Sequence, residues 1–121
     1  MLHLIFCLRR LPHLSRDEFQ RYWREHHAPV VRAHAAALGI HRYVQAHTVD
    51  HPVAAAAAAA RGAPEPFDGV AELWFDADEL LRLMQTDTGA EAARALLEDE
   101  RRFLDLARSP IFFAEDYVVV G

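Results

Sequence analysis

The stretch SRDEFQRYWREHHAPVVRAHAAALGIHRYVQAHTV, residues 15–49, predicts a helix followed directly by a strand. Ser15 and Glu18 have the spacing of a capping box, which begins a helix. Gly39 is typical of the residue that ends one, because glycine adopts the left-handed conformation at a helix terminus. The residues after it alternate, which predicts a strand over 40–49 with one face made of Tyr43, Gln45, His47 and Val49.

The polar residues of this helix gather around one apolar stripe. At about 100° per residue the stripe carries Phe19, Trp23, Val30 and Ala37, with His27 and His34 on or beside it and His26 on its other flank. An apolar stripe faces a core, so at least one of these histidines is expected to point inward. Pro29 has no N–H, so the Glu25 carbonyl loses its partner and the helix is expected to kink. The kink either separates two helices or shapes the mouth of a pocket.

Composition limits the class of protein. A chain of 121 residues with 52% apolar and 26% charged residues predicts one globular domain over 1–121. The net charge of −5 argues against nucleic acid or an anionic membrane as a partner. We expect no membrane span and no leader segment, because no apolar run reaches bilayer length. Cys7 is the single cysteine, which favours a reducing compartment and predicts a cytoplasmic protein.

Several cofactor chemistries lack the residues that they require. All 13 basic residues are arginine, so neither a lysine Schiff base nor a phosphate-binding GxxxxGK[ST] loop is present. No GxGxxG run occurs among the five glycines. None of the eight histidines falls in HExxH or another recognised ligand spacing. The sequence therefore predicts no metal and no cofactor.

The remaining segments complete a familiar order of elements. Strands are predicted over 1–10, 67–75 and 111–120, and Asp76 with Glu79 and Thr88 with Glu91 predict two helix starts between the last two. The alanine-rich segment 50–68 is either a short helix or a mobile excursion. The order strand, helix, strand, strand, helix, strand predicts an α+β, ferredoxin-like βαββαβ subunit, an antiparallel four-stranded sheet with helices on one face. Because strands carry apolar residues on both faces, we expect a homodimer packed through the open sheet face.

Five blocks of the sequence resemble the EthD family, within the dimeric α+β barrel group. They are RDEFQRYWREHHAPVVR (16–32), GIHRYVQAH (39–47), DGVAELWFDADE (68–79), EDERRFLD (98–105) and EDYVVV (115–120). The resemblance implies a ferredoxin-like subunit, a dimer, a cavity between sheet and helices, and an aromatic, polyketide-like or lactone ligand handled without metal or flavin. Leu73 stands where the lactone isomerases of this group have a cysteine, and Cys7 lies in a different strand, which counts against that activity.

His27, Tyr43 and His47 are the predicted catalytic residues. A neutral His27 can take a proton from an acidic carbon or a phenol, or it is a structural residue that caps a carbonyl freed by Pro29. Tyr43 can hydrogen-bond a substrate carbonyl and His47 can move protons, or Tyr43 is a half-buried aromatic at the rim. The acidic run 98–100 suits a solvated helix face, whereas the resemblance places Asp99, Glu100 and Phe103 together at a dimer or helix–sheet contact.

A second set of residues is predicted to bind the substrate: Trp23, His26, Val30, Gln45, Glu72 and Trp74. Trp23 and Trp74 either wall a pocket for a flat ligand or belong to the core. His26 is either at the pocket or a surface residue, and Glu72 either pairs with Arg42 or is a buried acid with a raised pKa.

Three functions fit this pattern. The first is a cofactor-independent enzyme that acts on an aromatic, polyketide-like or lactone molecule by proton transfer, in an isomerisation, dehydration or cyclisation. The second is a non-catalytic accessory protein that binds a small hydrophobic molecule. The third is an oxygenase that uses the carbanion of its own substrate to activate oxygen. An accessory protein would have aromatic cavity walls without converging polar groups, and an oxygenase would consume oxygen.

Overall fold

A four-stranded antiparallel sheet in the order β2-β3-β1-β4 organises the chain. The computed structural model describes residues 1–121. Its strands are β1 (Leu2–Leu8), β2 (Ile40–His47), β3 (Gly69–Phe75) and β4 (Ile111–Ala114). Its helices are α1 (Arg16–Tyr22), η1 (Trp23–His27), α2 (Ala28–Leu38), α3 (Pro52–Arg61), α4 (Ala77–Met84), α5 (Asp87–Glu100) and η2 (Leu106–Arg108). This confirms the predicted ferredoxin-like α+β arrangement.

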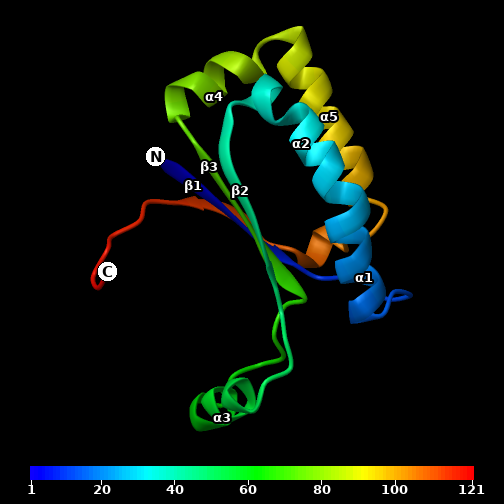
Figure 1. Ribbon diagram of the computed structural model, residues 1–121, viewed down its shortest axis with the longest axis vertical. Coiled ribbons are helices and arrows are strands. Elements are labelled where there is room, and N and C mark those ends of the chain that lie inside the picture. Colours follow the sequence, from blue (N-terminus) through cyan, green and yellow to red (C-terminus); the bar gives the residue numbers. More distant parts are fainter.

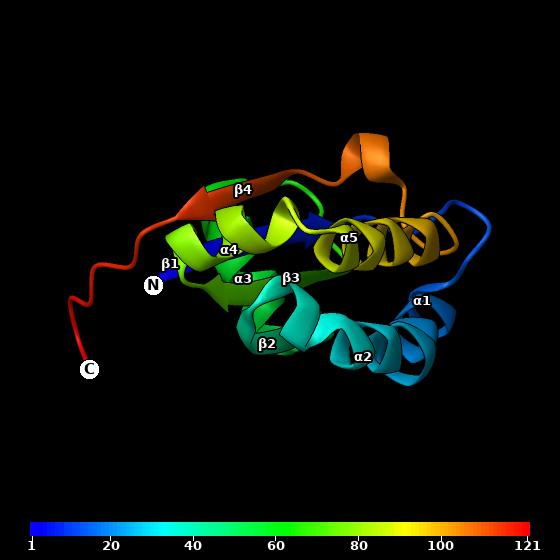
Figure 2. The same cartoon turned by 90° about the horizontal axis from the view of Figure 1, so that it is seen from above.

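The helices other than α3 lie toward one side of the sheet, and that side holds the core. Figure 1 shows α1, α2 and α5 on one face, with α3 projecting beyond the far end of the strands, and Figure 2 shows α2 and α5 side by side. The main buried cluster joins α1, η1 and the segment that follows α5 to β1 and β3, and it comprises Phe6, Leu8, Phe19, Trp23, Ala71, Phe103 and Leu104. The helices bury their apolar stripes there, and this burial is the main stabilising contribution. The opposite face of the sheet has no helix over it.

The long helix contains one widened turn, and that turn changes which side chains are buried. Residues Trp23–His27 form a π-helix, in which the Ala28 N–H donates to the Trp23 carbonyl five residues earlier. One extra residue in the turn moves every later position by one step around the helix axis. Val31 and Leu38 are therefore buried, at 3% and 6% exposure, in place of the predicted Val30 and Ala37. Pro29 follows the widened turn and lies in the first turn of α2.

Helix ends follow the predicted signals at all but one position. Ser15 and Glu18 form a capping box, Gly39 ends α2 with φ of 65°, and Asp76 caps α4. The prediction of Thr88 as a helix start was wrong: Thr86 caps α5 by accepting from the Gly89 N–H. Thr86 comes directly after the turn that ends α4, where its hydroxyl also donates to the Leu83 carbonyl at 2.6 Å.

Two further segments differ in extent from expectation or resolve an open choice. The alanine-rich segment forms the helix α3, capped by His51 and ended by Gly62, with no buried residue. The last strand was predicted over 111–120 but stops at Ala114, because only residues 111–114 find a partner, in β1. Beyond it Tyr117 and Val118–Val120 are between 82% and 93% exposed. No helix of the structure has both the length and the apolar composition needed to cross a membrane.

Candidate functional site

The His27 ring is hydrogen-bonded to the carboxylate of Asp99, which lies on α5. The π-helix turns His27 toward the sheet, where the residue is 5% exposed. Its Nδ1–H donates to Asp99 Oδ2 at 2.6 Å, and the Tyr22 hydroxyl donates to Asp99 Oδ1 at 2.7 Å. A carboxylate can only accept here, so the proton lies on Nδ1 and Nε2 carries the free lone pair. The structure therefore contains a carboxylate–histidine pair with one ring nitrogen available as a base.

Tyr43 presents its phenol to the same region from β2. The Trp23 indole N–H donates to the Tyr43 oxygen at 3.1 Å, and the Gln45 amide donates to it at 3.0 Å. Because both contacts use the oxygen as an acceptor, the Tyr43 O–H remains free to donate. The same Gln45 amide donates to the Trp23 carbonyl at 3.0 Å, so it ties β2 to the widened turn.

A small cavity lies between these groups. Its volume is about 40 Å³, which is room for one or two waters. Three polar side chains line it, His27, Tyr43 and Glu100, and the remaining wall is mainly apolar: Phe6, Leu8, Trp23, Val31, Ala71, Leu73, Leu96, Phe103 and Leu104. The Glu100 carboxyl group makes no hydrogen bond and no ion pair in the structure. An acid, a base and a hydroxyl donor thus face one apolar space.

The surroundings shift the pKa values of all three groups. Burial lowers the pKa of His27, although Asp99 acts in the opposite direction. Burial and the nearby Asp99 charge raise the pKa of Glu100 to about 7. Burial raises the pKa of Tyr43, against the hydrogen bonds from Gln45 and Trp23, and the Glu100 charge adds to the increase. At neutral pH His27 is therefore unprotonated on Nε2, Tyr43 is a neutral donor, and Glu100 is divided between its acid and its carboxylate.

The structure brings together only some of the predicted residues. His27, Tyr43 and Trp23 line the cavity. His47 does not line it: its Nε2–H donates to Gln45 Oε1 at 2.8 Å and its ring stacks on Trp23, with centroids 4.4 Å apart. Gln45 and His47 therefore do not line the cavity. They contact Tyr43 and Trp23, which do. The pKa of His47 is lowered by burial and by the charge of Arg24.

Four residues predicted to bind substrate lie away from the cavity. His26 is exposed and its ring lies against Tyr22, because it is on the outer side of the π-helix. Val30 is displaced from the cavity wall by the one-residue shift that brings in Val31. Glu72 and Trp74 are on the other face of the sheet, because they alternate along β3 with Ala71 and Leu73, which line the cavity.

Glu72 and Trp74 instead surround a buried histidine on the open face. His3 stacks on Trp74 with centroids 4.2 Å apart, and its Nε2 lies 3.1 Å from Glu72 Oε1. His3 Nδ1 is 2.8 Å from Asp116 Oδ1, which joins the C-terminal segment to β1. Arg42 lies over the Trp74 ring at 4.9 Å and makes no ion pair with Glu72, whose ionisable partner is His3.

Asp99 and Glu100 belong to the site, although the sequence does not predict them as catalytic or binding residues. The sequence leaves two interpretations of the acidic run 98–100, a solvated helix face or, from the family resemblance, a dimer or helix–sheet contact. Asp99 is 8% exposed and Glu100 lines the cavity, which favours the helix–sheet contact. A usable signal was present: Ala92, Leu96, Asp99 and Phe103 are spaced at four, three and four residues, which places Asp99 on the buried stripe of α5. A charged residue on such a stripe needs a partner, and His27 supplies it.

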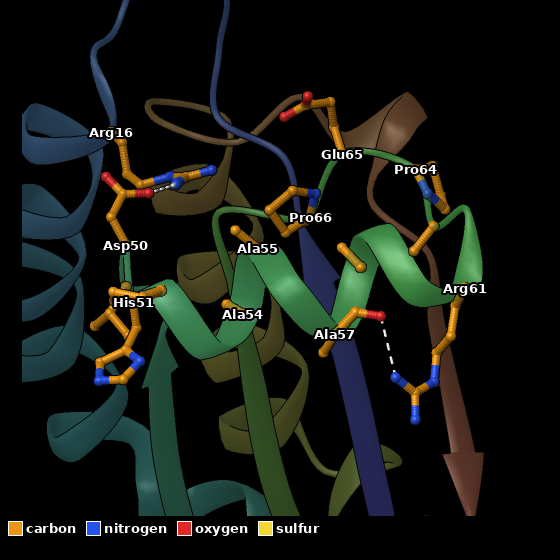
Figure 3. A pocket seen from close by; sticks show the side chains of 14 residues that line it. Arg16, Asp50, His51, Ala54, Ala55, Ala57, Arg61, Pro64, Glu65 and Pro66 are labelled. Carbon is orange, nitrogen blue, oxygen red and sulfur yellow. Dashed lines mark hydrogen bonds and ion pairs between the residues drawn. The ribbon is translucent and has the colours of Figure 1, made fainter.

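The largest hollow of the molecule lies elsewhere, beside α3. It has a volume of about 930 Å³ and shares no residue with the His27 cavity. In Figure 3 the Arg16 guanidinium meets Asp50, and Arg61 turns back onto the Ala57 carbonyl of its own helix at 3.0 Å. Three of its charged groups, Arg16, Asp50 and Arg61, are engaged with one another or with backbone, and only the Glu65 carboxylate has no partner. No group of three or more histidine, cysteine, aspartate or glutamate side chains is arranged to hold a metal ion.

Comparison with known proteins identifies the family of the fold. The EthD domain model matches residues 11–107. No protein of curated function matches the sequence significantly. Among solved structures, an EthD family protein of Bacillus halodurans superposes with a TM-score of 0.58 at 19% identity, covering 97% of this chain and 99% of that one.

Two further solved structures share the fold. A dimeric protein of unknown function and ferredoxin-like fold from Bacteroides fragilis has a TM-score of 0.54 at 9% identity, with 95% of each chain covered. The N63A mutant of SnoaB, a cofactor-independent oxygenase from Streptomyces nogalater, has a TM-score of 0.53 at 17% identity, covering 98% of this chain and 95% of that one. At these identities the similarity shows a shared fold.

Proposed function

The chain belongs to the EthD family, and from that premise we propose that it is a small enzyme that moves protons on an aromatic, polyketide-like or lactone substrate without a cofactor. One observation carries the proposal: His27, Tyr43 and Glu100 face the same apolar cavity. The shifts of their pKa values favour a neutral His27, a protonated Tyr43 and a partly protonated Glu100 at neutral pH. General acid–base catalysis needs a base and an acid with pKa values near the working pH.

In the proposed chemistry His27 and Glu100 transfer protons and Tyr43 donates a hydrogen bond. His27 Nε2 takes a proton from an acidic carbon or phenol of the substrate, and the Asp99 carboxylate stabilises the resulting imidazolium. Tyr43 donates a hydrogen bond to the carbonyl oxygen on which negative charge develops. Protonated Glu100 gives its proton either to a second carbon, which completes an isomerisation, or to a departing hydroxyl, which leaves as water. No electron acceptor is needed, since each outcome conserves the oxidation level of the substrate.

The predicted roles of the remaining residues become positioning roles in this proposal. Gln45 and Trp23 fix the Tyr43 oxygen through the two hydrogen bonds that they donate. His47 fixes Gln45 and stacks on Trp23, so it acts through them. The cavity admits only a reacting edge of a substrate, because its volume is about 40 Å³. The body of the molecule must lie outside it.

Two other functions use the same cavity. A non-catalytic binding protein is disfavoured by the convergence of three titratable groups, which add desolvation cost to a purely apolar binding site. An oxygenase needs the same proton abstraction and then a reaction of the carbanion with oxygen. SnoaB is described as a cofactor-independent oxygenase. Oxygen uptake separates this outcome from simple proton transfer.

We also propose that the partner of the chain is a second copy of itself, in the cytoplasm. The sheet face opposite the helices carries Ile5, Cys7, Val70 and Phe112, and no other element of the chain covers them. An uncovered apolar sheet face of this kind is typical of an interface. The Bacteroides fragilis protein of the same fold is described as dimeric.

A deuterium-incorporation screen tests the proposed activity. The protein is incubated in D₂O with β-hydroxy ketones, unsaturated lactones and polyphenols, and products are followed by mass spectrometry with oxygen uptake in parallel. Turnover with incorporation of one solvent deuterium, or loss of water, and no oxygen uptake is expected. Oxygen consumption in proportion to product would contradict the proposal and support the oxygenase function. Tight binding without turnover would contradict it and support the accessory-protein function.

A further inference from the structure

A second hollow adjoins the catalytic cavity on its outer side. It lies between α2 and β2, has a volume of about 230 Å³, and is lined by Ala28, Val31, Arg32, Ala35, Ile40, His41, Arg42 and Tyr43. Val31 and Tyr43 line both this groove and the cavity of about 40 Å³, so the two spaces adjoin at these two side chains. The groove has the space that the inner cavity lacks.

The charge of the groove opposes that of the whole protein. The chain has a net charge of −5, yet the groove is lined by two arginines, Arg32 and Arg42, together with His41, and by no acidic residue. Two of these groups have other partners: Arg42 lies over Trp74 at 4.9 Å, and His41 Nε2 is 3.5 Å from Glu79 Oε1. Arg32 is exposed, and its side chain makes no ion pair or hydrogen bond in the structure. Its guanidinium is therefore available to a ligand.

The apolar part of the groove suits a small flat body. Ala28 and Ala35 come from the same side of α2 as Arg32, with Ile40 and the Tyr43 ring opposite on β2. Small side chains on α2 leave room for a ring. The Tyr43 side chain extends from this groove to the inner cavity. A molecule lying here would have one end at Arg32 and the other toward Tyr43 and His27.

We propose that this groove is the substrate-binding subsite and that it selects a small organic carboxylate, whose anionic end pairs with Arg32. The inference rests on the proposed function, since it places the reacting edge at His27. Guanidinium and carboxylate match as a planar, two-bonded pair, which gives direction as well as attraction. Because Arg32 is exposed to solvent, the preference for an anion over its neutral counterpart is moderate, about three- to tenfold in Kd.

Titration of the ¹⁵N-labelled full-length protein with benzoate and with benzamide, at fixed ionic strength, tests the subsite. The two probes share size and shape and differ in charge. Benzoate should shift the amide signals around Val31, Arg32 and Tyr43 saturably, with a Kd at least about threefold lower than benzamide. Arg32→Gln should make the two Kd values equal. Arg82→Gln, which removes an exposed arginine of α4 outside the groove, should leave the preference intact.

Three results would overturn the subsite: equal Kd values in the wild type, a preference that survives Arg32→Gln, or shifts confined to the hollow beside α3. His27→Gln separates this inference from the proposed function, because it should abolish turnover and leave benzoate binding unchanged. A benzoate preference that depends on Arg32 in a protein without turnover upholds the subsite and refutes the enzyme. Turnover that depends on His27 with no role for Arg32 upholds the enzyme and refutes the subsite.

Discussion

Asp99 Oδ2 lies 2.6 Å from His27 Nδ1, and this hydrogen bond joins the last turn of α5 to the widened turn between α1 and α2. The two residues are 72 positions apart in the sequence, and both are nearly buried. The carboxylate decides which ring nitrogen carries the proton, and so which one faces the cavity as a base. This one contact therefore both connects α5 to the π-helix and sets the tautomer of His27.

Replacing Asp99 by asparagine should therefore change the titration of His27. The neutral amide of Asp99→Asn cannot stabilise the imidazolium by charge, so the pKa of His27, already lowered by burial, should fall further. Turnover should drop about 10- to 100-fold because the ring loses its fixed tautomer. Histidine NMR titration gives the pKa directly. Tyr22→Phe is the matched control: it removes the other hydrogen bond to Asp99 and should lower the rate much less.

Replacing Glu100 by glutamine should flatten the pH dependence of both stability and activity. The folded protein keeps this proton up to a pKa of about 7, whereas the ordinary value is 4.5. The folded state thus binds more protons between these values, so the free energy of unfolding of the wild type should fall as the pH rises from about 4.5 to about 7. The loss is on the order of 3 kcal/mol, and Glu100→Gln should not show it.

The activity of the same variant provides an independent readout. If Glu100 acts as the acid, wild-type kcat/KM should decline as the pH rises through about 7, and Glu100→Gln should be slow at every pH without that decline. Urea unfolding and kcat/KM measured from about pH 5 to about pH 9 cover both statements. Glu98→Gln, on the exposed side of α5, is the control. A wild-type stability that does not change over this interval would contradict the pKa assigned to Glu100.

Adding one methyl group at Gly69 in β3 should displace the Trp23 side chain, which lines the cavity. A Cβ there would lie 2.5 Å from Trp23 Cζ3 and 2.9 Å from the Ala46 carbonyl oxygen, so the indole would have to move. We expect Gly69→Ala to lower the free energy of unfolding by about 2 kcal/mol and to weaken the Trp23–Tyr43 hydrogen bond. Tryptophan fluorescence during urea unfolding measures both. Gly62→Ala meets no atom within 4 Å and should cost only the smaller strain of its left-handed backbone.

A charge on the open sheet face should separate the proposed dimer. Val70→Lys places an ammonium among the apolar residues that no helix covers, and light scattering should then report a monomer. Val53→Lys changes an equally apolar residue on α3, 68% exposed, and should leave the dimer intact. A wild type that is monomeric at micromolar concentration would contradict the proposal, as would a Val70→Lys protein that remains dimeric.

Local signals in the sequence were enough for the fold. The order of elements is predicted by the capping boxes, by Gly39 and by the alternation along the strands. The apolar residues on both faces of the strands can be recognised in each strand by itself. They were also enough to place Tyr43, Gln45 and His47 on one face of β2, because the alternation of a strand is rigid. The end of β4 was missed, since pairing with β1 and not strand propensity decides where it stops.

The site was predicted less completely, for two physical reasons. Helical periodicity assumes a constant turn, and the π-helix at Trp23–His27 violates that assumption, so periodicity predicts a buried Val30 where Val31 is buried. Pairing across the sheet or between helices is not encoded locally, so the contact of His27 with Asp99 could not be read from either segment alone. Glu72 and Trp74 were placed with His27 because the face of β3 that meets the helices was not assigned.

The most direct test compares His27→Gln with His26→Gln on a substrate found in the deuterium screen. The two histidines are neighbours, but His27 lines the cavity while His26 is exposed on the outer side of the π-helix. We predict that His27→Gln lowers kcat at least about 100-fold with an unchanged circular dichroism spectrum, and that His26→Gln retains the wild-type rate. Equal rates for wild type and His27→Gln would show that His27 is structural and would contradict the proposed mechanism.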